Sequence, residues 1–383
     1  MKLNPYLAKH SKAQQIIAPP YDVISLTESK KYLDKSPDAM LSITLPDSID
    51  ANLTQTSVNL AQKLNQHFDL INSQCFIIYQ IETSKGIQNG LCCLADTDKL
   101  IKHELTQPAK VKNRVELLES VKCQISPIML CTSPELQLSK LLSSTCSNKQ
   151  PYSEVNFNND IHRIFVITEP SSVKHISEVY KKARLYIADG HHRSQTQQFL
   201  HQQQPMNFSS HTLSVIFPGE SLNILGYHRI IKPKFKINDI QLWQKLASIC
   251  EIEHSKSAIF PKKKSIIGCY YQKQWYSLRI KNSSINTLAV DILHDQIIEP
   301  IFNISDPRTD KQLSFIGGMD ANKKIESQVD CIAESIAFTL CPTSIDDIIR
   351  TANENRVMPP KSTYFEPKLL DGLVIQEESK ILT

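Results

Sequence analysis

Leu185-Tyr186-Ile187-Ala188-Asp189-Gly190-His191-His192-Arg193 is the most informative segment of the chain. Its first four residues are apolar and predict a short buried strand that ends at Asp189. A helical pattern follows from Gln195 to Gln203, so the polar residues between the two elements lie in a strand-to-helix turn. Gly190 permits a positive φ angle or a close approach of the backbone at this turn.

The residues of this turn are typical of an anion-binding site. The first amides of a helix lack intrahelical partners, and they carry a partial positive charge. Arg193 adds a planar, permanently charged group that suits phosphate oxygens, and His191 and His192 can donate hydrogen bonds or transfer protons near neutral pH. Asp189 could cap the helix, orient a histidine or bind Mg²⁺. The alternative is a capped polar turn exposed to solvent.

The rest of the chain mixes strands and helices without a strict β-α-β alternation. This mixture predicts an α+β fold with mixed β-sheets and flanking helices. The expected helices cover residues 26–33, 53–68, 115–122, 174–182, 290–299 and 332–337. The expected strands cover residues 75–81, 91–95, 127–130, 161–168, 212–217, 224–231, 265–271 and 372–375, with a hairpin turn at Gly86 to Gly90.

Length and composition limit the classes of protein. A chain of 383 residues can form two domains, here residues 1–150 and 151–383, or one integrated domain. The net charge of +4 is small and its basic residues are scattered, which disfavours nucleic-acid binding. The ten cysteines lack metal-ligand spacing and are expected to be reduced thiols. The N-terminus has no signal-peptide pattern and no run reaches a membrane span, so we expect a cytoplasmic protein. The oligomeric state stays open.

Two short polar segments precede the central turn. Tyr21-Asp22 follows Pro19-Pro20, which stiffens the backbone, so Asp22 could act as a general base or metal ligand, or cap the next helix. His103-Glu104 could supply an acid and a base, with Lys112 and Arg114 as phosphate contacts. The alternative for this second segment is a network of salt bridges at the surface.

Two further polar segments follow the central turn. His228-Arg229 interrupts an apolar run, and neighbouring residues of a strand point to opposite faces, so at most one of the two faces a site. Lys361-Ser362-Thr363 follows the turn at Pro359-Pro360. This hydroxyl-rich stretch could close over a phosphate, with Lys361 and Lys368 as point charges, or it could dock the C-terminal segment.

The central turn resembles the Asp-Gly-x-His-Arg turn of the ParB/sulfiredoxin superfamily. Members of that superfamily bind nucleotide phosphates at this turn, and they include free-serine kinases. The resemblance implies a ParB/sulfiredoxin-like nucleotide-binding core with additional elaborations. Sulfiredoxin itself is disfavoured, because His191 stands where its reactive cysteine would be. The P-loop and Rossmann glycine motifs do not occur in the sequence.

Over nearly its full length the chain resembles the bacterial and archaeal domain-of-unknown-function family numbered 1015. The matching motifs, in order, are Ile17 to Ile24, His103-Glu104-x-Thr106 with Lys112-x-Arg114, the central turn, Tyr227-His228-Arg229, and Met358 to Lys368. Members of the family commonly carry an aromatic residue after the arginine of the turn. Ser194 stands there in this chain, which weakens any base-stacking role of that position.

These observations predict a phosphoryl-transfer enzyme, by resemblance a serine-like small-molecule kinase, whose donor is ATP, ADP or pyrophosphate with Mg²⁺. The predicted catalytic residues are His191, His192, Asp22 and Glu104. The predicted cofactor-binding residues are Asp189, Gly190, His192, Arg193, Lys361, Ser362 and Thr363, with Asp189 also a metal ligand. The predicted substrate-binding residues are Tyr21, His103, Arg114, His228 and Arg229. One alternative is a regulator that binds a nucleotide or metabolite without catalysis. The other is a histidine-dependent phosphodiesterase or nuclease, which the scattered charge disfavours.

Overall fold

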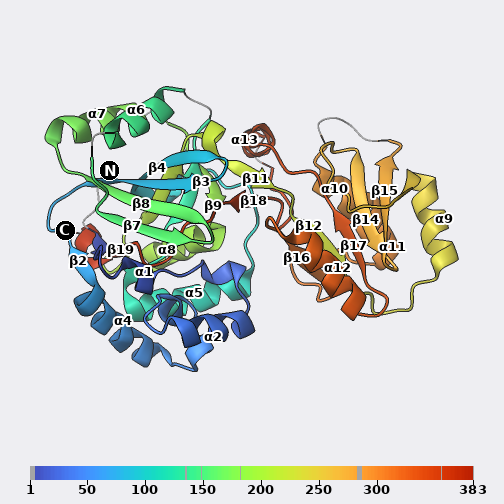
Figure 1. Cartoon of the computed structure of the whole chain (residues 1–383), viewed down its shortest axis with the longest axis horizontal. Coiled ribbons are helices and arrows are strands. Elements are labelled where there is room, and N and C mark those ends of the chain that lie inside the picture. Colours follow the sequence, from blue (N-terminus) through green and yellow to red (C-terminus); the bar gives the residue numbers. More distant parts are fainter. Residues whose placement is uncertain are drawn as a thin grey trace. The chain divides into compact units, whose positions relative to one another are not determined.

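The computed structural model describes residues 5–133, 136–147, 149–181, 183–282, 287–354 and 356–382. The chain divides into two compact units (Figure 1). The first unit holds Met1–Lys102, Thr106–Leu222 and Pro367–Thr383, and the second holds His103–Leu105 and Asn223–Glu366. Residue 150, where the sequence suggested a boundary, lies inside the first unit between α6 (Leu136–Cys146) and β7 (Ser153–Phe157).

The first unit is built on a seven-stranded mixed sheet in the order β7-β8-β3-β4-β10-β6-β9. Only β6 and β10 are paired in parallel, and the other neighbours are antiparallel. Its remaining strands are β3 (Phe76–Thr83), β4 (Gly86–Asp96), β6 (Ile128–Cys131), β8 (Asp160–Ile167), β9 (Tyr186–Asp189) and β10 (His211–Phe217). The central strands are apolar and almost fully buried, as expected for a sheet covered on both faces.

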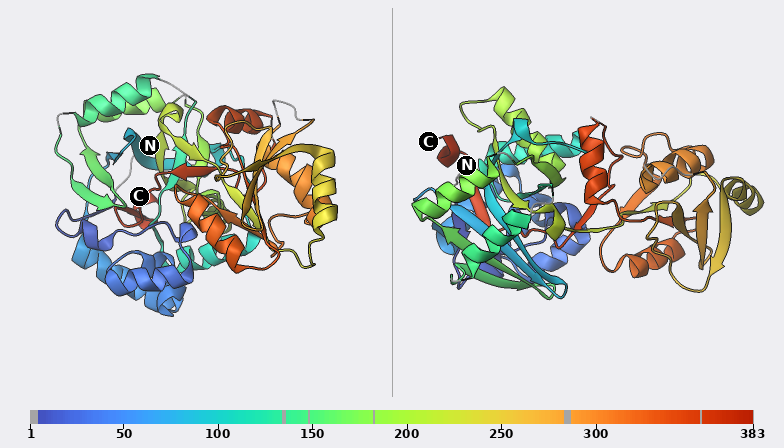
Figure 2. Two further views of the ribbon diagram at one scale, coloured as in Figure 1. Left: turned by 45° about the vertical axis from the view of Figure 1, so that its right-hand side comes forward. Right: turned by 90° about the horizontal axis from the view of Figure 1, so that it is seen from above.

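A second, four-stranded sheet of this unit joins the two ends of the chain. Its order is β2-β1-β19-β5, and all its pairs are antiparallel. The strands are β1 (Tyr6–Ala8), β2 (Phe68–Leu70), β5 (Cys123–Gln124) and β19 (Val374–Glu377). Because β1 pairs with β19, the two ends of the chain lie near each other in every view (Figure 2).

Helices cover both sides of the seven-stranded sheet. In Figure 1, α6 and α7 lie on one side, and α8, α5 and α4 lie on the other. The α-helices of this unit besides α6 are α1 (Ala13–Ile16), α2 (Leu26–Lys35), α3 (Leu41–Thr44), α4 (Leu53–His67), α5 (Pro108–Val121), α7 (Pro170–Tyr180), α8 (His191–Gln203) and α14 (Ser379–Leu382). Short helical turns are η1 (Tyr21–Val23), η2 (Pro46–Ile49), η3 (Thr97–Lys99) and η4 (Gly219–Ser221).

The second unit contains a six-stranded antiparallel sheet in the order β13-β15-β14-β17-β12-β16. The strands are β12 (His228–Ile231), β13 (Cys250–Ser255), β14 (Ile266–Tyr271), β15 (Gln274–Ile280), β16 (Leu313–Ile316) and β17 (Ile336–Thr339), and a separate pair joins β11 (Asn223–Leu225) to β18 (Tyr364–Glu366). The helices are α9 (Asp239–Ile249), α10 (Ala289–Leu293), η5 (His294–Ile298), α11 (Glu299–Phe302), α12 (Ala321–Cys331) and α13 (Ile345–Asn353).

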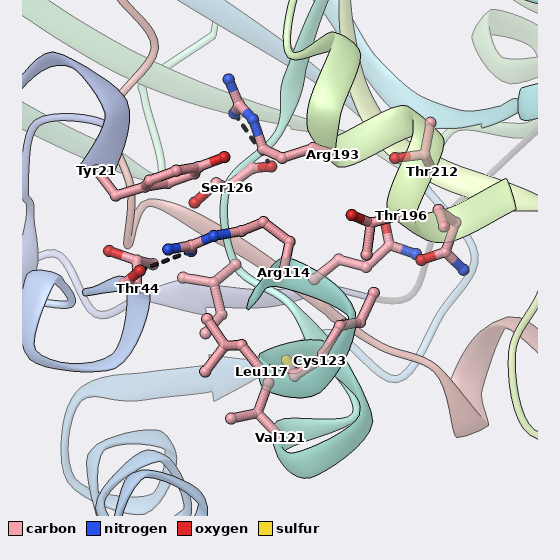
Figure 3. Close-up of a pocket in the computed structure, with 14 residues that line it drawn as sticks. Tyr21, Thr44, Arg114, Leu117, Val121, Cys123, Ser126, Arg193, Thr196 and Thr212 are labelled. Atoms are coloured by element: carbon pink, nitrogen blue, oxygen red, sulfur yellow. Dashed lines mark hydrogen bonds between the residues drawn. The ribbon is translucent and has the colours of Figure 1, made fainter. Parts of the chain in front are cut away.

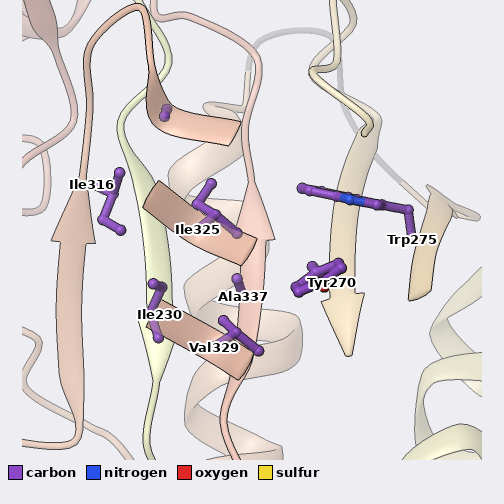
Figure 4. Close-up of a cluster of buried hydrophobic side chains, with 8 residues drawn as sticks. Ile230, Tyr270, Trp275, Ile316, Ile325, Val329 and Ala337 are labelled. Carbon is purple, nitrogen blue, oxygen red and sulfur yellow. The ribbon is translucent and has the colours of Figure 1, made fainter. Parts of the chain in front are cut away.

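The core of the second unit lies where α12 crosses its sheet. Ile325 and Val329 on α12 pack against Ile230, Ala337 and other buried side chains of the strands (Figure 4). Burial of apolar surface stabilises the folded state by about 25 cal/mol per Å², so this contact is the main interaction that stabilises this face of the sheet. The α+β class and the mixed sheets with flanking helices predicted from the sequence are confirmed.

Three predicted elements were wrong. The hairpin turn lies at Ser84-Lys85, and Gly86 to Gly90 belongs to β4. The expected strand 224–231 is divided at Gly226-Tyr227 into β11 and β12, which pair with different partners. The expected helix 332–337 contains the start of β17, because a short apolar run fits a buried strand as well as a helix.

None of the ten cysteines, all of which lie in the described ranges, forms a disulfide, and eight of them are buried. This agrees with the expectation of reduced thiols, and burial raises the pKa of such a thiol, as at Cys75, to about 12. In the described ranges, no helix combines the length and the hydropathy that a membrane span requires.

Candidate functional site

The strand and the glycine turn lie where the sequence predicts them, and the helix begins at His191, before the expected start at Gln195. β9 ends at Asp189, Gly190 adopts φ +100°, and α8 begins at His191. A Cβ atom added to Gly190 would lie 2.6 Å from Cγ2 of Ile128 on the neighbouring strand β6. Glycine is therefore required twice, for its positive φ and for the close contact between strand and turn. Gly190 is itself the N-cap residue, so Asp189 does not cap α8.

Arg193 projects from the first turn of α8, and its side chain is 12% exposed. Its Nη1 donates to the carbonyl oxygen of Pro127 at 2.6 Å, and Nη2 lies 4.0 Å from Oδ2 of Asp189. Burial alone would lower the pKa of Arg193, but the negative charges of Asp22 and Asp189 outweigh it and hold the pKa above its usual value. Within the described part of the chain, Nε of Arg193 is buried and has no hydrogen-bond partner.

A pocket opens beside Arg193 (Figure 3). Its volume is about 70 Å³. One water molecule needs about 10–15 Å³ on the same measure, so the pocket is large enough for a phosphoryl group. One part of its wall is polar and the other is an apolar surface of α5 (Figure 3). The lining residues are Tyr21, Thr44, Arg114, Leu117, Leu118, Val121, Cys123, Gln124, Ile125, Ser126, Arg193, Thr196, Gln197 and Thr212.

A second guanidinium, that of Arg114, lines the same pocket. It comes from α5, and its Nη1 donates to the carbonyl oxygen of Thr44 at 2.6 Å. The Cζ atom of Arg114 lies 3.5 Å from the centre of the Tyr21 ring, a cation–π contact that holds the charge in place. Burial and the negative charge of Asp22 raise the pKa of Tyr21, whereas Arg114 and Arg193 lower it. The phenol, both arginines and Asp22 therefore form one electrostatic cluster.

Two hydroxyl groups of α8 add to the polar groups of this region. Thr196 lies one turn after Arg193 and lines the pocket, and Ser194 lies beside Arg193 in the sequence. Both side chains are buried, and neither hydroxyl has a hydrogen-bond partner in the described ranges. A buried polar group without a partner costs free energy, so the hydroxyl of Thr196 is a group that a ligand in the pocket could satisfy.

Asp371 belongs to this cluster and was missed by the sequence analysis. Its side chain is 1% exposed, and its backbone pairs with that of Ala18 through two hydrogen bonds of 3.1 and 3.0 Å. Burial raises the pKa of Asp371 to about 7, while the charge of Arg193 opposes the rise. The only local signal is a carboxylate after the apolar pair Leu369-Leu370, and long-range pairing alone brings it to the site.

Asp189 lies in the turn, and its charge is already matched. Nζ of Lys368 lies 3.0 Å from Oδ2 of Asp189, with Arg193 at 4.0 Å on the same oxygen. A carboxylate held between two cations does not favour a divalent metal ion. Among the described residues, no three histidine, cysteine, aspartate or glutamate side chains gather around a common point. The residues around the turn therefore do not fit a resident Mg²⁺ ion.

The two histidines of the turn do not line the pocket. Nε2 of His192 accepts the backbone N–H of Gln107, the N-cap residue of α5, at 2.9 Å. His192 therefore serves as a cap for α5, and this bond fixes its protonation at Nδ1. His191 is 6% exposed and packs at the start of α8. Their proposed roles as acid and base receive no support from this geometry.

The predicted site residues His103, Glu104, His228 and Arg229 lie in the second unit, and all of them except Glu104 are buried there. His103 and His228 are fully or nearly fully buried, and burial lowers the pKa of His103 to about 4 and that of His228 to about 3. Arg229 is 3% exposed; it donates to the carbonyl oxygens of Tyr227 and, at 3.3 Å, Pro360. Burial lowers the pKa of Arg229 to about 10, which the charge of Glu104 opposes.

Lys361, Ser362 and Thr363 also lie in the second unit. Lys361 has a left-handed backbone with φ 59°, and its Nζ lies 5.3 Å from the centre of the Tyr227 ring. The Ser362 hydroxyl donates to the carbonyl oxygen of Pro359 at 2.7 Å, and Thr363 is 8% exposed. These contacts order the segment within its own unit, and its role toward a phosphate stays a prediction.

Solved structures similar to this chain include nucleotide complexes. A mutant free serine kinase in complex with ADP shares 11% identity with a TM-score of 0.41, covering 76% of this chain and 94% of that chain. A conserved hypothetical protein from Pyrococcus furiosus shares 12% identity with a TM-score of 0.40, covering 76% and 97%. C-terminally truncated SbnI from Staphylococcus aureus shares 12% identity with a TM-score of 0.39, covering 73% and 85%.

No curated protein matches the sequence. The family model described as "Protein of unknown function (DUF1015)" matches residues 4–300. That range includes Tyr21, Arg114 and Arg193, which line the pocket of the first unit. The chain therefore belongs to the DUF1015 family.

Proposed function

We propose that this protein binds a phosphorylated small molecule, a nucleotide or pyrophosphate, in the pocket beside α8 and transfers its terminal phosphoryl group. The observation that supports this most strongly is the pair of guanidinium groups, Arg114 and Arg193, that line one small pocket. Phosphoryl transfer depends on positioning and on neutralising the charge of the transferred group, and arginine suits both tasks. Thr196 and Nε of Arg193 supply buried donors for phosphate oxygens.

Asp22 is the proposed general base. It does not line the pocket itself, but it directly follows Tyr21, which does. Its charge acts on Arg193, and its buried Oδ1 has no hydrogen-bond partner in the described part of the chain. In the proposed step, the hydroxyl oxygen of an acceptor forms a bond to phosphorus, while the bond from phosphorus to the leaving oxygen of the donor breaks. The hydroxyl proton passes to the carboxylate of Asp22. A small alcohol such as serine is the acceptor that the sequence resemblance suggests.

The proposal assigns no protein ligand to Mg²⁺. Mg²⁺ is commonly carried by phosphate oxygens and water, with few protein ligands, so the ion would enter with the donor. The alternative of a histidine-dependent phosphodiesterase gains no support, because Nε2 of His192 already accepts the amide of Gln107 and His191 is buried at the start of α8.

The test is a transfer assay followed by ³¹P NMR. Wild type is incubated with ATP, ADP or pyrophosphate, Mg²⁺ and a panel of small alcohols that includes serine. We expect a new phosphate ester with wild type, loss of transfer but retained donor binding in Asp22→Asn, and loss of both in Arg193→Ala. Donor binding without transfer to any acceptor would support the non-catalytic regulator instead, and full activity of Asp22→Asn would exclude Asp22 as the base.

A further inference from the structure

The first half of α8 carries buried polar atoms that have no hydrogen-bond partner within the described ranges. Among them are Nε of Arg193, Oγ of Ser194, Oγ1 of Thr196 and Oε1 of Gln197. Buried polar groups are normally hydrogen-bonded, so each exception needs an explanation. Arg193, Thr196 and Gln197 also line the pocket. A ligand in the pocket can therefore supply the missing partners.

The side-chain amide of Gln197 is held in one orientation. The residue is 1% exposed, and its Nε2 donates to the carbonyl oxygen of Ser209 at 2.7 Å. The reverse orientation would place two acceptor oxygens against each other, so the position of Oε1 is fixed. This oxygen can only accept a hydrogen bond, and none of the described residues donates one to it.

A second glutamine of the same pocket shows the contrast. Nε2 of Gln124 donates to the carbonyl oxygen of His211 at 3.0 Å and to Oε1 of Glu378 at 2.7 Å. Oε1 of Gln124 accepts the backbone N–H of Leu213 at 2.6 Å. Both ends of Gln124 are therefore used within the fold, whereas Gln197 keeps an acceptor for a ligand.

The pocket combines three kinds of surface. Arg114 and Arg193 can only donate hydrogen bonds, and Oε1 of Gln197 can only accept one. An ionised phosphate group satisfies the arginines but brings no donor for Gln197. The missing donor is a neutral hydroxyl rather than an ammonium group, because two guanidinium groups repel a further cation. Apolar side chains of α5, among them Leu117 and Val121, suit the carbon atoms of a ligand (Figure 3).

We propose that Gln197 is a specificity-determining residue, whose Oε1 accepts the hydroxyl group of a small organic phosphate while Arg114 and Arg193 hold its phosphate group. This inference rests on the proposed function only in that the pocket binds a phosphorylated compound. It favours a phosphate ester with a free hydroxyl group, a class that includes nucleotides, over inorganic pyrophosphate. An analogue without the hydroxyl binds less well, because the buried acceptor then gains no partner.

The test compares two phosphate esters of equal size on the full chain. 2-Hydroxyethyl phosphate carries a hydroxyl group where propyl phosphate carries a methyl group. In calorimetric titration, wild type should bind the hydroxyl compound about tenfold more tightly, which is the effect of one hydrogen bond to a buried acceptor. Gln197→Met keeps the length of the side chain and suits a helix, and it should bind the two esters equally. Gln197→Ala repeats the test with a second variant.

Gln80→Met is the matched control. Gln80 is a buried glutamine of the first unit outside the pocket, and both of its ends are bonded, to Asn89 and to Arg163. This control should keep the preference of wild type for the hydroxyl compound, because a general loss of packing weakens the binding of both esters alike.

The inference is overturned by equal affinities of wild type for the two esters, by a preference that persists in a Gln197 variant, or by loss of the preference in Gln80→Met. Binding of pyrophosphate but of neither ester to wild type would likewise contradict the inference alone. Failure of wild type to bind pyrophosphate and both esters would contradict the proposed function and the inference together.

Discussion

The guanidinium of Arg114 stacks on the ring of Tyr21, with Cζ 3.5 Å from the ring centre. This contact joins the Pro-Pro-Tyr-Asp segment near the N-terminus to helix α5, and it fixes one of the two cations of the pocket. A cation–π contact contributes about 0.5–2 kcal/mol, with the larger values in desolvated surroundings.

Tyr21 should therefore contribute to anion binding through its ring. We expect Tyr21→Leu to weaken pyrophosphate binding by roughly twofold to thirtyfold, because Arg114 becomes mobile and the contact of about 0.5–2 kcal/mol is lost. Tyr21→Phe keeps the ring and should bind nearly as wild type. Calorimetric titration checks this, and equal affinities for the leucine and phenylalanine variants would show that the ring does not hold Arg114.

Arg193 should not be replaceable by lysine. Lysine keeps the charge but cannot donate to the carbonyl of Pro127 and to a phosphate at once from a planar group. Since hydrogen bonds to charged groups contribute about 1.5–3 kcal/mol, we expect a loss of affinity of about ten- to a hundredfold. The control is Arg163→Lys, in an ion-pair network with Glu82 and Glu154 outside the pocket. Equal behaviour of the two variants in the titration would remove Arg193 from the site.

Gly190 should tolerate no side chain. Gly190→Ala places a Cβ at φ +100° and 2.6 Å from Ile128, and backbone strain alone costs about 1–3 kcal/mol. Gly86→Ala is a matched control, because Gly86 has φ +132° and no atom within 4 Å of an added Cβ. Urea unfolding should show the larger loss for Gly190→Ala. Equal losses would mean that the contact with Ile128 relaxes freely.

The carboxyl of Asp371 predicts a pH dependence of stability. Its pKa is raised by burial from 3.8 to about 7 in the folded chain, so the folded state binds more protons than the unfolded state between these values. Stability is therefore highest below this range and falls as the pH rises through it. One pKa unit corresponds to about 1.4 kcal/mol, so wild type should lose roughly 2–3 kcal/mol between pH 5 and pH 8 relative to Asp371→Asn.

Urea unfolding of both proteins at the two pH values measures this difference, and contributions of other titrating groups cancel in the comparison. Parallel pH profiles for wild type and Asp371→Asn would show that Asp371 does not titrate in this range.

The part of the site that is local in sequence was predictable. The apolar run before Asp189 and the single glycine after it indicate a strand and a turn, and both are present together with the helix. Arg193 follows from the same pattern, since the first turn of a helix is where an arginine can meet an anion.

The rest depends on distant pairing. The role of His192 is decided by the amide of Gln107, and that of Asp371 by its pairing with Ala18. Neither the hydrophobic periodicity nor the composition of a segment indicates such contacts. The extent of the first unit also depends on distant pairing. β1 pairs with β19, so the C-terminal residues belong to the first unit, and no local pattern around residue 150 indicates this.

A crystal structure of the protein with pyrophosphate and Mg²⁺ would show whether the two arginines share one phosphate. We predict a phosphate group in the pocket, with an oxygen at about 3 Å from Nε of Arg193 and the second face of the group toward Arg114. Pyrophosphate bound elsewhere, with water alone between the two guanidinium groups, would contradict the proposed function.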